Sequence, residues 1–553
     1  MNFFKNNKLF NFFSKNEIKI VITFFFLYFC IGAFIYKDYG FNVDEKFNRS
    51  NGFFWLNYLA NFFNFNELSE IAINKYNLIQ SNTLQTVNDI GIYSIIFDVP
   101  AALLEIFFNI ESEIQAYQLR HFLTFFHFFI TVIFFFLLVK NRFNNSFISI
   151  LSILIFILTP RLFGDSFHNN KDIIFLTYYT VSIFFYFRFL DDYSYKNIIF
   201  LSFFSAVSTS FRIIGIFIPF SLILIFIINF FKKNNKLNFN KIIIHFIFYA
   251  IFLFMIWPFF WEHPLQSLLK YFEIIKNYGS PNVFFLGQYY PSNLVPYYYF
   301  IFWIALTTPI LHLILFSFGF TSYLIRISKR FIKLDNFNNL NDIWKSKKES
   351  KDFLIFINLI VFLVFFSFFN VHGYNGWRLG YFIYIFLIYF GIYTIYLIFL
   401  KFSNKLKNIF LISLLCFFIF SGYRLSIYHP YQSFYFNLFV PTKIKNSVEI
   451  DFAGLSGIHF LNQILNQENN SNIIKIGVAS WYPLWFMVDL LEEVNKTKIQ
   501  ILNLKNLKDA DYIYSNRISD VDKTKYNKYF VPKTFKKKEI KIDDVIIYEI
   551  YTK

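Results

Sequence analysis

The stretch IKIVITFFFLYFCIGAFIY, residues 18–36, is an almost unbroken apolar run near the start of the chain. A helix of this length, rising 1.5 Å per residue, is just long enough to cross a hydrocarbon layer about 30 Å thick. The run follows a basic N-terminus and lacks a small-residue cleavage site. It therefore predicts a retained membrane anchor rather than a removed signal peptide.

Similar runs recur along the chain and predict a mainly α polytopic membrane protein with about eleven transmembrane helices. The composition agrees, because only 16% of the 553 residues are charged, against roughly 25% in soluble domains. The two cysteines lie in apolar runs, which disfavours disulfides and Cys-based metal sites. The predicted spans are 18–36, 117–139, 146–160, 174–190, 197–211, 213–231, 241–258, 299–325, 353–369, 381–400 and 408–425.

The formal net charge of +17 is weak evidence for a nucleic-acid partner. Phe, Ile, Asn, Lys and Tyr are all abundant together, which is typical of an AT-rich coding sequence. The excess of lysine then reflects coding bias, so no nucleic-acid binding is predicted. The positions of the basic residues carry more information than their number.

The short connectors between alternate predicted spans are basic. Because Lys and Arg are retained in cytoplasmic loops, we expect the basic connectors to face the cytoplasm. An odd number of spans then leaves the C-terminus outside, in a multi-pass protein of the cell inner (plasma) membrane. The basic connectors are 5–19, 140–142, 231–241, 326–351 and 401–407, of which 326–351 is interpreted as a solvated linker.

The remaining connectors hold nearly all the clusters of chemically reactive residues, and they share the outer face. A purely structural origin for these clusters would distribute them over both faces. The asymmetry therefore predicts one site that faces outward. These connectors are the long first outer loop 37–116 and the segments 161–172, 261–298, 370–380 and 428–432.

The chain changes character after about residue 437, where apolar runs give way to alternating strand and helix patterns. We expect a membrane domain over 1–436 and a small extracytoplasmic α/β domain over 437–553. The second region has no Gly-rich phosphate loop and no metal-ligand spacing, so no chemistry is assigned to it. Its predicted elements are strands 473–479, 498–504 and 509–516, a helix 481–494, and a hairpin 539–552 that turns at the "DD" pair.

Two outward clusters contain acids. Asp44 and Glu45 follow the first span, and "GDSFHNNKD" at 164–172 follows the third. Acidic groups at a membrane interface are costly unless they are solvated, paired or used. A solvated loop explains a lone acid, whereas two clusters on one face suit a general base and its supporting groups. The second cluster supplies Asp165, His168, Lys171 and Asp172.

Cations accompany these acids. Arg212 interrupts apolar sequence in "STSFRIIG", and Arg378 lies in the outward "YNGWR". A buried guanidinium needs an anionic partner, and a phosphate matches its forked donors. An ion pair with an acid on another helix explains Arg212 equally well. With Lys171, these residues suit the phosphate of a lipid carrier, while Arg161 and His121 are weaker candidates.

The combination predicts an enzyme that uses an anionic lipid at the outer surface. A carboxylate would deprotonate an acceptor hydroxyl while cations stabilise the phosphate leaving group. No soluble nucleotide-binding fold is visible on the inner face, and an outward site lacks access to cytosolic nucleotide sugars. A polyprenyl-phosphate sugar satisfies both constraints.

Several motifs in order resemble membrane glycosyltransferases of the GT-C fold, in the dolichyl-phosphate-mannose-protein mannosyltransferase-like superfamily. The similarity covers most of residues 18–460. The motifs are "VDE" at 43–45, "LTPRLFGDSFHNNKD" at 158–172, "STSFRIIG" at 208–215, "WPFFWEHP" at 257–264, "LVPYYYFIFWIALTTP" at 294–309, "YNGWR" at 374–378 and "HPYQSFYFN" at 429–437.

The resemblance implies inverting transfer of a sugar from a polyprenyl-phosphate donor to a lipid, glycan or protein acceptor at the outer face. It assigns Asp44 the role of catalytic base or acceptor-positioning group, with Glu45 as its neighbour. The acid of the second motif is Asp165 or Asp172, and "NKD" favours Asp172. Arg212 and Arg378 would then bind the lipid phosphate.

The chain departs from the family pattern in two places. Leu379 and Gly380 follow "YNGWR", where related bacterial sequences usually have His, and Phe452 and Ala453 replace an aromatic pair after "VEID". Some GT-C relatives bind a divalent metal, but the ligands do not map onto this sequence. No metal ligand is assigned.

Two other classes of protein compete with the enzyme. A lipid-linked saccharide transporter would explain the spans and Arg212, but it predicts polar groups through the membrane midplane. The polar clusters here sit mostly at one face. A non-catalytic scaffold leaves the ordered outer motifs unexplained.

Overall fold

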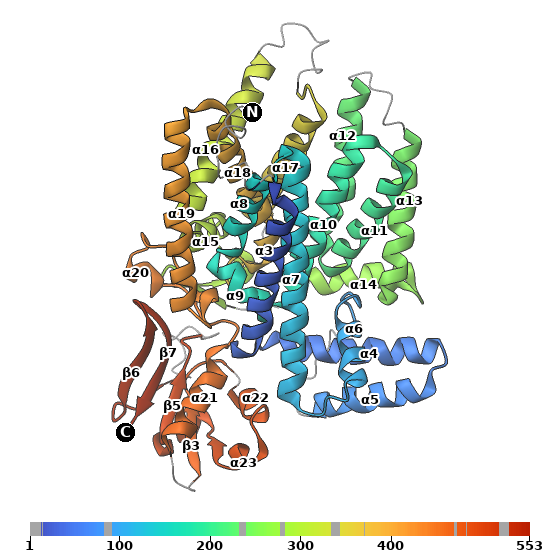
Figure 1. The fold of residues 1–553 in the computed structure, drawn as a ribbon. Helices are drawn as coiled ribbons and strands as arrows, with labels where there is room; N and C mark the ends of the chain where they lie inside the picture. The colour runs from blue at the N-terminus through green and yellow to red at the C-terminus, as the bar shows by residue number, and fades with distance from the viewer. Residues whose placement is uncertain are drawn as a thin grey trace.

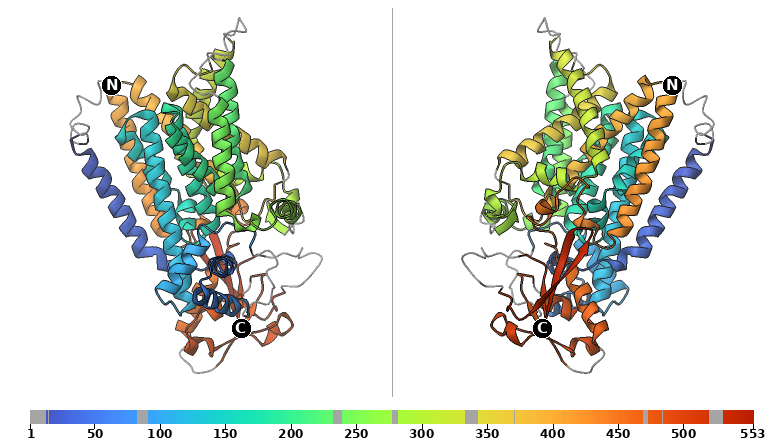
Figure 2. Two further views of the ribbon diagram at one scale, coloured as in Figure 1. Left: turned by 90° about the vertical axis from the view of Figure 1, so that its right-hand side faces the viewer. Right: turned by 90° about the vertical axis from the view of Figure 1, so that its left-hand side faces the viewer.

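A bundle of long helices makes up most of the protein, and a small α/β region caps one end (Figures 1 and 2). This arrangement confirms the predicted fold class, a polytopic α-helical membrane protein with a C-terminal α/β region. The computed structural model describes residues 13, 15–81, 91–231, 239–276, 282–332, 343–369, 371–468, 473–482, 484–518 and 530–553.

Nine helical segments within the described residues are long and apolar enough to cross a membrane. They run through α3 (Glu17–Ile35), α7 (Glu113–Phe143), α10 (Asn170–Asp192), α12 (Phe217–Phe231), α13 (Phe239–Ile256), α16 (Ile310–Ile332), α17 (Lys347–Phe368), α18 (Tyr384–Lys401) and α19 (Asn404–Ile427).

The remaining two of the eleven predicted spans are also helical, but each differs from a simple crossing. Helices α8 (Ser146–Ile157) and α9 (Pro160–His168) form one apolar path that bends by 70° at Pro160. Helix α11 (Tyr195–Phe211) has 17 residues, slightly fewer than the about 20 of a straight crossing. The predicted span 299–325 breaks into α15 (Tyr299–Thr307) and α16.

The first outer loop is largely helical and lies at the same end of the bundle as the C-terminal sheet (Figure 1). Its helices are α4 (Asp44–Phe62), α5 (Asn66–Ser81) and α6 (Asp98–Phe107). We call this the sheet end. The N-terminal end of α3 lies at the opposite end of the bundle (Figure 1).

The C-terminal region contains a five-stranded mixed sheet of order β4-β3-β5-β7-β6. Strand β3 pairs in parallel with β4 and β5, and β7 pairs antiparallel with β5 and β6. The predicted hairpin turns between Ile542 and Val545, at the "DD" pair. The strands are β3 (Ile474–Val478), β4 (Ile499–Ile501), β5 (Tyr512–Ser515), β6 (Lys536–Ile542) and β7 (Val545–Thr552).

Other elements of this region differ from the prediction. The helix expected over 481–494 is split into α22 (Leu484–Asp489) and α23 (Glu493–Lys496). A helix α21 (Ser456–Gln467) and a hairpin of β1 (Asn282–Phe285) and β2 (Gln288–Pro291) were not predicted. The remaining elements of the whole chain are α14 (Pro264–Lys276), α20 (Thr442–Lys445), η1 (Tyr36–Asp38), η2 (Ile213–Ile216), η3 (Pro258–Phe260), η4 (Ser292–Leu294), η6 (Arg378–Ile383), η7 (Gln432–Phe434) and η8 (Leu504–Asp509).

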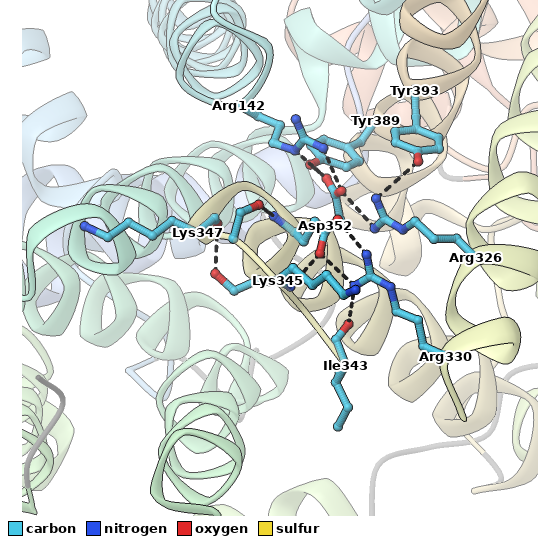
Figure 3. Close-up of polar contacts among 12 residues, drawn as sticks. Arg142, Arg326, Arg330, Ile343, Lys345, Lys347, Asp352, Tyr389 and Tyr393 are labelled. Carbon is cyan, nitrogen blue, oxygen red and sulfur yellow. Dashed lines mark hydrogen bonds and ion pairs between the residues drawn. The ribbon is translucent and has the colours of Figure 1, made fainter. Parts of the chain in front are cut away.

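An ion-pair network joins four helices (Figure 3). The fully buried carboxylate of Asp352 accepts hydrogen bonds from Arg142 at 2.6 and 2.7 Å, from Arg326 at 3.0 Å and from Tyr389 at 2.6 Å. These residues come from α17, α7, α16 and α18. The end of the charged segment 326–351 differs from the predicted solvated linker, because Lys351 beside Asp352 is 1% exposed. Parts of three basic connectors, at 5–12, 14, 232–238 and 333–342, lie outside the described residues.

Helices α16 and α18 approach closely because glycine leaves room at their contact. A Cβ at Gly319 would lie 1.8 Å from the carbonyl oxygen of Phe390 and 2.8 Å from the hydroxyl oxygen of Thr394. Small residues of this kind let helices pack closely in a membrane, where there is little hydrophobic driving force between them.

Replacing Gly319 with alanine is expected to lower stability by about 1–3 kcal/mol, because the added methyl group forces the two backbones apart. The loss should appear as a lower thermal-unfolding midpoint of the purified protein in detergent. Gly422→Ala on α19 is the control, since nothing lies within 4 Å of a Cβ at that position. Equal midpoints for the two variants would contradict the proposed close packing.

Candidate functional site

Two carboxylates and two guanidinium groups meet at the sheet end of the bundle. Arg378 donates to Asp44 at 2.8 Å, and its Nε lies 3.8 Å from the Oδ2 of Asp172. Arg212 forms an ion pair with the other oxygen of Asp172. We call these four residues the acid–arginine cluster. It brings together segments that the sequence separates by more than 300 positions.

Hydrogen bonds with asparagine side chains position both acids. The side chain of Asn42 accepts a hydrogen bond from the backbone N–H of Asp44, the first residue of α4, at 3.0 Å. Asn169 caps α10 by accepting from the backbone N–H of Asp172 at 3.2 Å, and its amide donates to the Asp172 carboxylate at 3.1 Å. Asn and Asp are preferred at helix N-termini for this reason. In the sequence, the signal for the cap of α10 is an Asn that stands three residues before an Asp.

The two arginines lie at breaks in helical structure. Arg212 ends α11 with an extended backbone, φ −146° and ψ 127°, and η2 begins directly after it. Arg378 begins η6, after a loop in which Asn375 and Gly376 both have positive φ. The tight turn before Arg378 directs the chain back toward the bundle. These breaks place the two side chains at the cluster instead of continuing a helix past it.

Asp165 and His168 are buried next to the cluster and contact neighbouring polar side chains. Tyr381 donates to the Asp165 carboxylate at 2.6 Å, and Asn169 contacts the same carboxylate at 3.3 Å. His168 Nε2 lies 3.1 Å from the hydroxyl oxygen of Ser433. Asn169 therefore links Asp165 to Asp172, and sequence reasoning missed Asn169, Tyr381 and Ser433. Both predicted residues, Asp165 and His168, are buried and contact the supporting groups.

Glu45 does not join its neighbour Asp44. Consecutive residues of a helix point about 100° apart, so the two side chains leave α4 in different directions. The Glu45 carboxylate accepts from the backbone N–H of Asn42 at 2.8 Å and lies 3.1 Å from His121 Nε2. It is 1% exposed. The structure thus places Glu45 and His121 at the base of α4, where they hold its first turn.

Lys171 adds a third positive charge beside the cluster. Its Nζ lies over the ring of Tyr93, 3.1 Å from the ring centre. Such a contact between an ammonium group and an aromatic face is favourable. The Lys171 charge lies close enough to Asp44 to help lower the pKa of that carboxyl.

The four residues of the acid–arginine cluster, two carboxylates and two guanidinium groups, are neutral as a set. Burial raises the pKa of Asp44, but the charge of Arg378, with smaller contributions from Lys171 and Arg212, outweighs burial and leaves this pKa below its usual value. Asp44 is therefore ionised at neutral pH. Its side chain is 51% exposed, whereas Asp172 is 2% exposed, so Asp44 is the accessible acid.

The C-terminal region contributes to the same site. The backbone N–H of Val43 donates to the carbonyl of Ala453 at 3.1 Å, and the Phe452 ring lies 5.9 Å from the guanidinium carbon of Arg378. Phe452 and Ala453 form one of the two places at which the sequence departs from the family pattern. The segment that replaces the aromatic pair thus supports the loop before Asp44 and covers Arg378.

Arg161 supports the loop that carries Arg378. Its side chain is fully buried, and its guanidinium carbon lies 5.1 Å from the centre of the Trp303 ring. A Cβ at Gly376 would lie 2.9 Å from Arg161 Nη1. The guanidinium therefore packs under the turn before Arg378. Among the described residues, no group of three or more His, Cys, Asp or Glu side chains is arranged to hold a metal ion.

Residues 99–261 match the family model of dolichyl-phosphate-mannose-protein mannosyltransferase. This match confirms the family resemblance over a segment that includes Asp165, His168, Lys171, Asp172 and Arg212. No curated protein matches the chain.

Two solved structures are similar over nearly the full length of the chain. The apo crystal structure of ArnT from Cupriavidus metallidurans has 9% identity and a TM-score of 0.48, with 97% of this chain and 98% of that chain covered. The crystal structure of the same protein bound to undecaprenyl phosphate has 11% identity and a TM-score of 0.42, with 96% and 97% covered.

Proposed function

We propose that this multi-pass membrane protein, which matches a mannosyltransferase family model over residues 99–261, transfers a sugar from a polyprenyl-phosphate donor to an acceptor at the sheet end. The observation that carries the proposal is the acid–arginine cluster. It combines an accessible ionised carboxylate with a buried Arg378 and a partly buried Arg212 at a break between apolar helices. We further propose that the sheet end is extracytoplasmic, in the inner (plasma) membrane.

The cations of the cluster suit the phosphate of the donor. Arg212 and Arg378 present planar, forked donors that match phosphate oxygens, and Lys171 adds a point charge. When the phosphate binds, it competes with Asp172 and Asp44 for these donors. The lipid chain would extend along the apolar helices, so the phosphate and its sugar lie at the membrane surface.

Asp44 is the proposed general base. Its carboxylate would remove the proton from an acceptor hydroxyl, whose oxygen attacks the anomeric carbon of the sugar. A new C–O bond forms as the bond from the anomeric carbon to the phosphate oxygen breaks. The bonding electrons go to the phosphate, where Arg212 and Arg378 stabilise the added charge. Attack from the face opposite the phosphate inverts the anomeric centre. The acceptor is a hydroxyl of a lipid, glycan or protein.

The test uses the purified full-length protein in lipid nanodiscs with a panel of radiolabelled polyprenyl-phosphate sugars and mixed hydroxyl acceptors. The expected result is transfer of label from at least one donor with release of polyprenyl phosphate. Binding of the lipid with movement across the bilayer and no transfer would support a transporter instead. Absence of both binding and transfer would support a scaffold.

Arg378→Lys is expected to weaken binding of sugar-free polyprenyl phosphate by about tenfold to a hundredfold. Lysine keeps the charge but loses the forked pair of donors, and a charged hydrogen bond contributes about 1.5–3 kcal/mol. Binding is measured by titration of the lipid into nanodiscs. Arg188→Lys, on the exposed surface of α10, is the control. Unchanged affinity of Arg378→Lys would exclude Arg378 from the phosphate site.

A further inference from the structure

Helix α14 (Pro264–Lys276) lies across the ends of the long helices, beside the end of α13 (Figure 1). It has 13 residues and is about 20 Å long at a rise of 1.5 Å per residue. A straight crossing of a membrane takes about 20 residues of helix. Helix α14 is therefore too short to span a membrane, and it follows the rim of the bundle at the sheet end.

One face of α14 packs on the protein. Ser267, Tyr271 and Ile274 share this face, because residues four and seven positions apart in a helix lie on one side. Tyr271 is buried, and its ring centre lies 5.3 Å from that of Trp257. Burial raises the pKa of Tyr271, and Arg212 lies close enough to act on it in the opposite direction. This face of α14 is therefore a neighbour of the acid–arginine cluster.

A second face of α14 is apolar and exposed. It consists of Leu265, Leu268, Leu269 and Phe272, whose side chains are 79%, 40%, 70% and 53% exposed. We call these four residues the apolar stripe. Their spacing of three, four and seven positions is the pattern by which a surface helix normally packs its apolar side on a core. An exposed apolar patch of this kind marks a surface that contacts another apolar phase or a partner.

The third face of α14 is polar and exposed, and it carries Gln266, Lys270 and Glu273. At 3.6 residues per turn, the centres of the three faces lie about 100–140° apart around the helix. A helix between protein and water needs only a buried face and a polar face. A third, apolar face indicates that α14 also meets hydrocarbon.

The apolar surface of α13 leads to the apolar stripe. Helix α13 is long and apolar enough to cross a membrane, and its last two turns expose Ile251, Phe254 and Met255 by 47%, 45% and 58%. Trp261 follows, and its indole N–H donates to the carbonyl of Phe254 at 2.6 Å. Tryptophan is enriched where a membrane meets water. The exposed apolar surface therefore continues from a predicted span, past an interfacial Trp, into α14.

We propose that α14 is an in-plane membrane helix whose apolar stripe contacts the hydrocarbon of the bilayer lipids at the sheet end. Its polar face then meets the headgroups and water, and its third face packs on the bundle beside the acid–arginine cluster. Helices of this type bury their apolar face by about 5–10 Å below the headgroups. This contact does not depend on sugar transfer, so it goes beyond the proposed function.

The test measures the depth of single positions of α14 in the full-length protein in lipid nanodiscs. Cys30→Ser and Cys416→Ser first remove both cysteines. Leu269→Cys on the apolar stripe and Lys270→Cys on the polar face are then labelled separately with a fluorophore. Quenching is compared between a lipid that carries a nitroxide near its headgroup and aqueous iodide. Ile251→Cys on α13 is the reference for a position in lipid.

The label at position 269 is expected to be quenched by the nitroxide lipid, at a depth of about 5–10 Å, and to be protected from iodide. The label at 270 should show the opposite preference. Both replaced side chains are exposed, so both variants should keep the thermal-unfolding midpoint of the cysteine-free protein. Equal quenching of the two labels by iodide would place the apolar stripe in water and overturn the proposal. Protection of the 269 label from both quenchers would show that protein, such as a second copy of the chain, covers the stripe, which also overturns it.

Discussion

Asp44→Asn is expected to lower the turnover number for glycosyl transfer by about 10²- to 10⁴-fold, the usual contribution of a general base. Asparagine has nearly the shape of aspartate, and its side-chain oxygen can still accept from Arg378, which donates to Asp44 at 2.8 Å. It cannot take a proton from the acceptor hydroxyl. The loss should therefore appear in kcat, with little change in the KM for the donor.

Binding of sugar-free polyprenyl phosphate provides the second measurement on the same variant. Removing the charge of Asp44 leaves the cations with one fewer competing anion, so the lipid should bind with equal or higher affinity. Glu111→Gln is the matched control, because Glu111 is an exposed acid of the same outer loop. If Asp44→Asn keeps full turnover, Asp44 is not the base. If it loses lipid binding and turnover together, its role is structural.

Glu45 offers a direct comparison with its neighbour. The carboxylate of Glu45 is buried against His121 and the backbone of Asn42, so it has no access to an acceptor. Its role in the structure is to hold the first turn of α4. The two adjacent acids that the sequence presents as a pair therefore have different environments, one accessible and one internal.

Asp352→Asn is expected to destabilise the protein by about 3–5 kcal/mol, the cost of leaving buried charges without their partner. Asp352 is the acceptor for Arg142 and Arg326, and its carboxylate is fully buried (Figure 3). The substitution leaves two positive charges facing each other between α7 and α16. The measurement is the thermal-unfolding midpoint in detergent.

The control for this effect is Glu493→Gln. Glu493 forms an ion pair with Lys496, but its side chain is 85% exposed, and pairs of this kind contribute about 0–1 kcal/mol. The Asp352 network lies at the end opposite the acid–arginine cluster, so the folded fraction of Asp352→Asn should keep its affinity for polyprenyl phosphate. A midpoint equal to that of Glu493→Gln would show that the network does not stabilise the bundle.

Much of the architecture follows from local sequence. Every predicted span is helical, because the apolar character of about 20 consecutive residues decides the partition into a membrane without reference to distant contacts. The strands of the C-terminal region and the turn at Asp543 and Asp544 were also predicted, because alternation and turn residues act over a few positions. The sequence did not predict that the helix expected over 481–494 splits into α22 and α23. The ends of these helices depend on how they pack beside the sheet.

The candidate residues were only partly predictable. The sequence predicts that Asp44, Asp172 and Arg378 share one side of the membrane, because the basic connectors predict the sidedness of the loops. It left open whether Arg212 pairs with an acid, and it did not separate the role of Asp165 from that of Asp172. The structure pairs Arg212 with Asp172 and turns Asp165 toward Tyr381.

By itself, the sequence determined that this chain is a multi-pass α-helical protein with a segment of the mannosyltransferase family pattern. Hydropathy and short motifs carry that information, because they depend on neighbours in the chain. Only the tertiary structure decided which acid is exposed and which arginines meet the two acids. The contact between residues 44 and 378 crosses 334 positions, and it depends on how the helices between them pack.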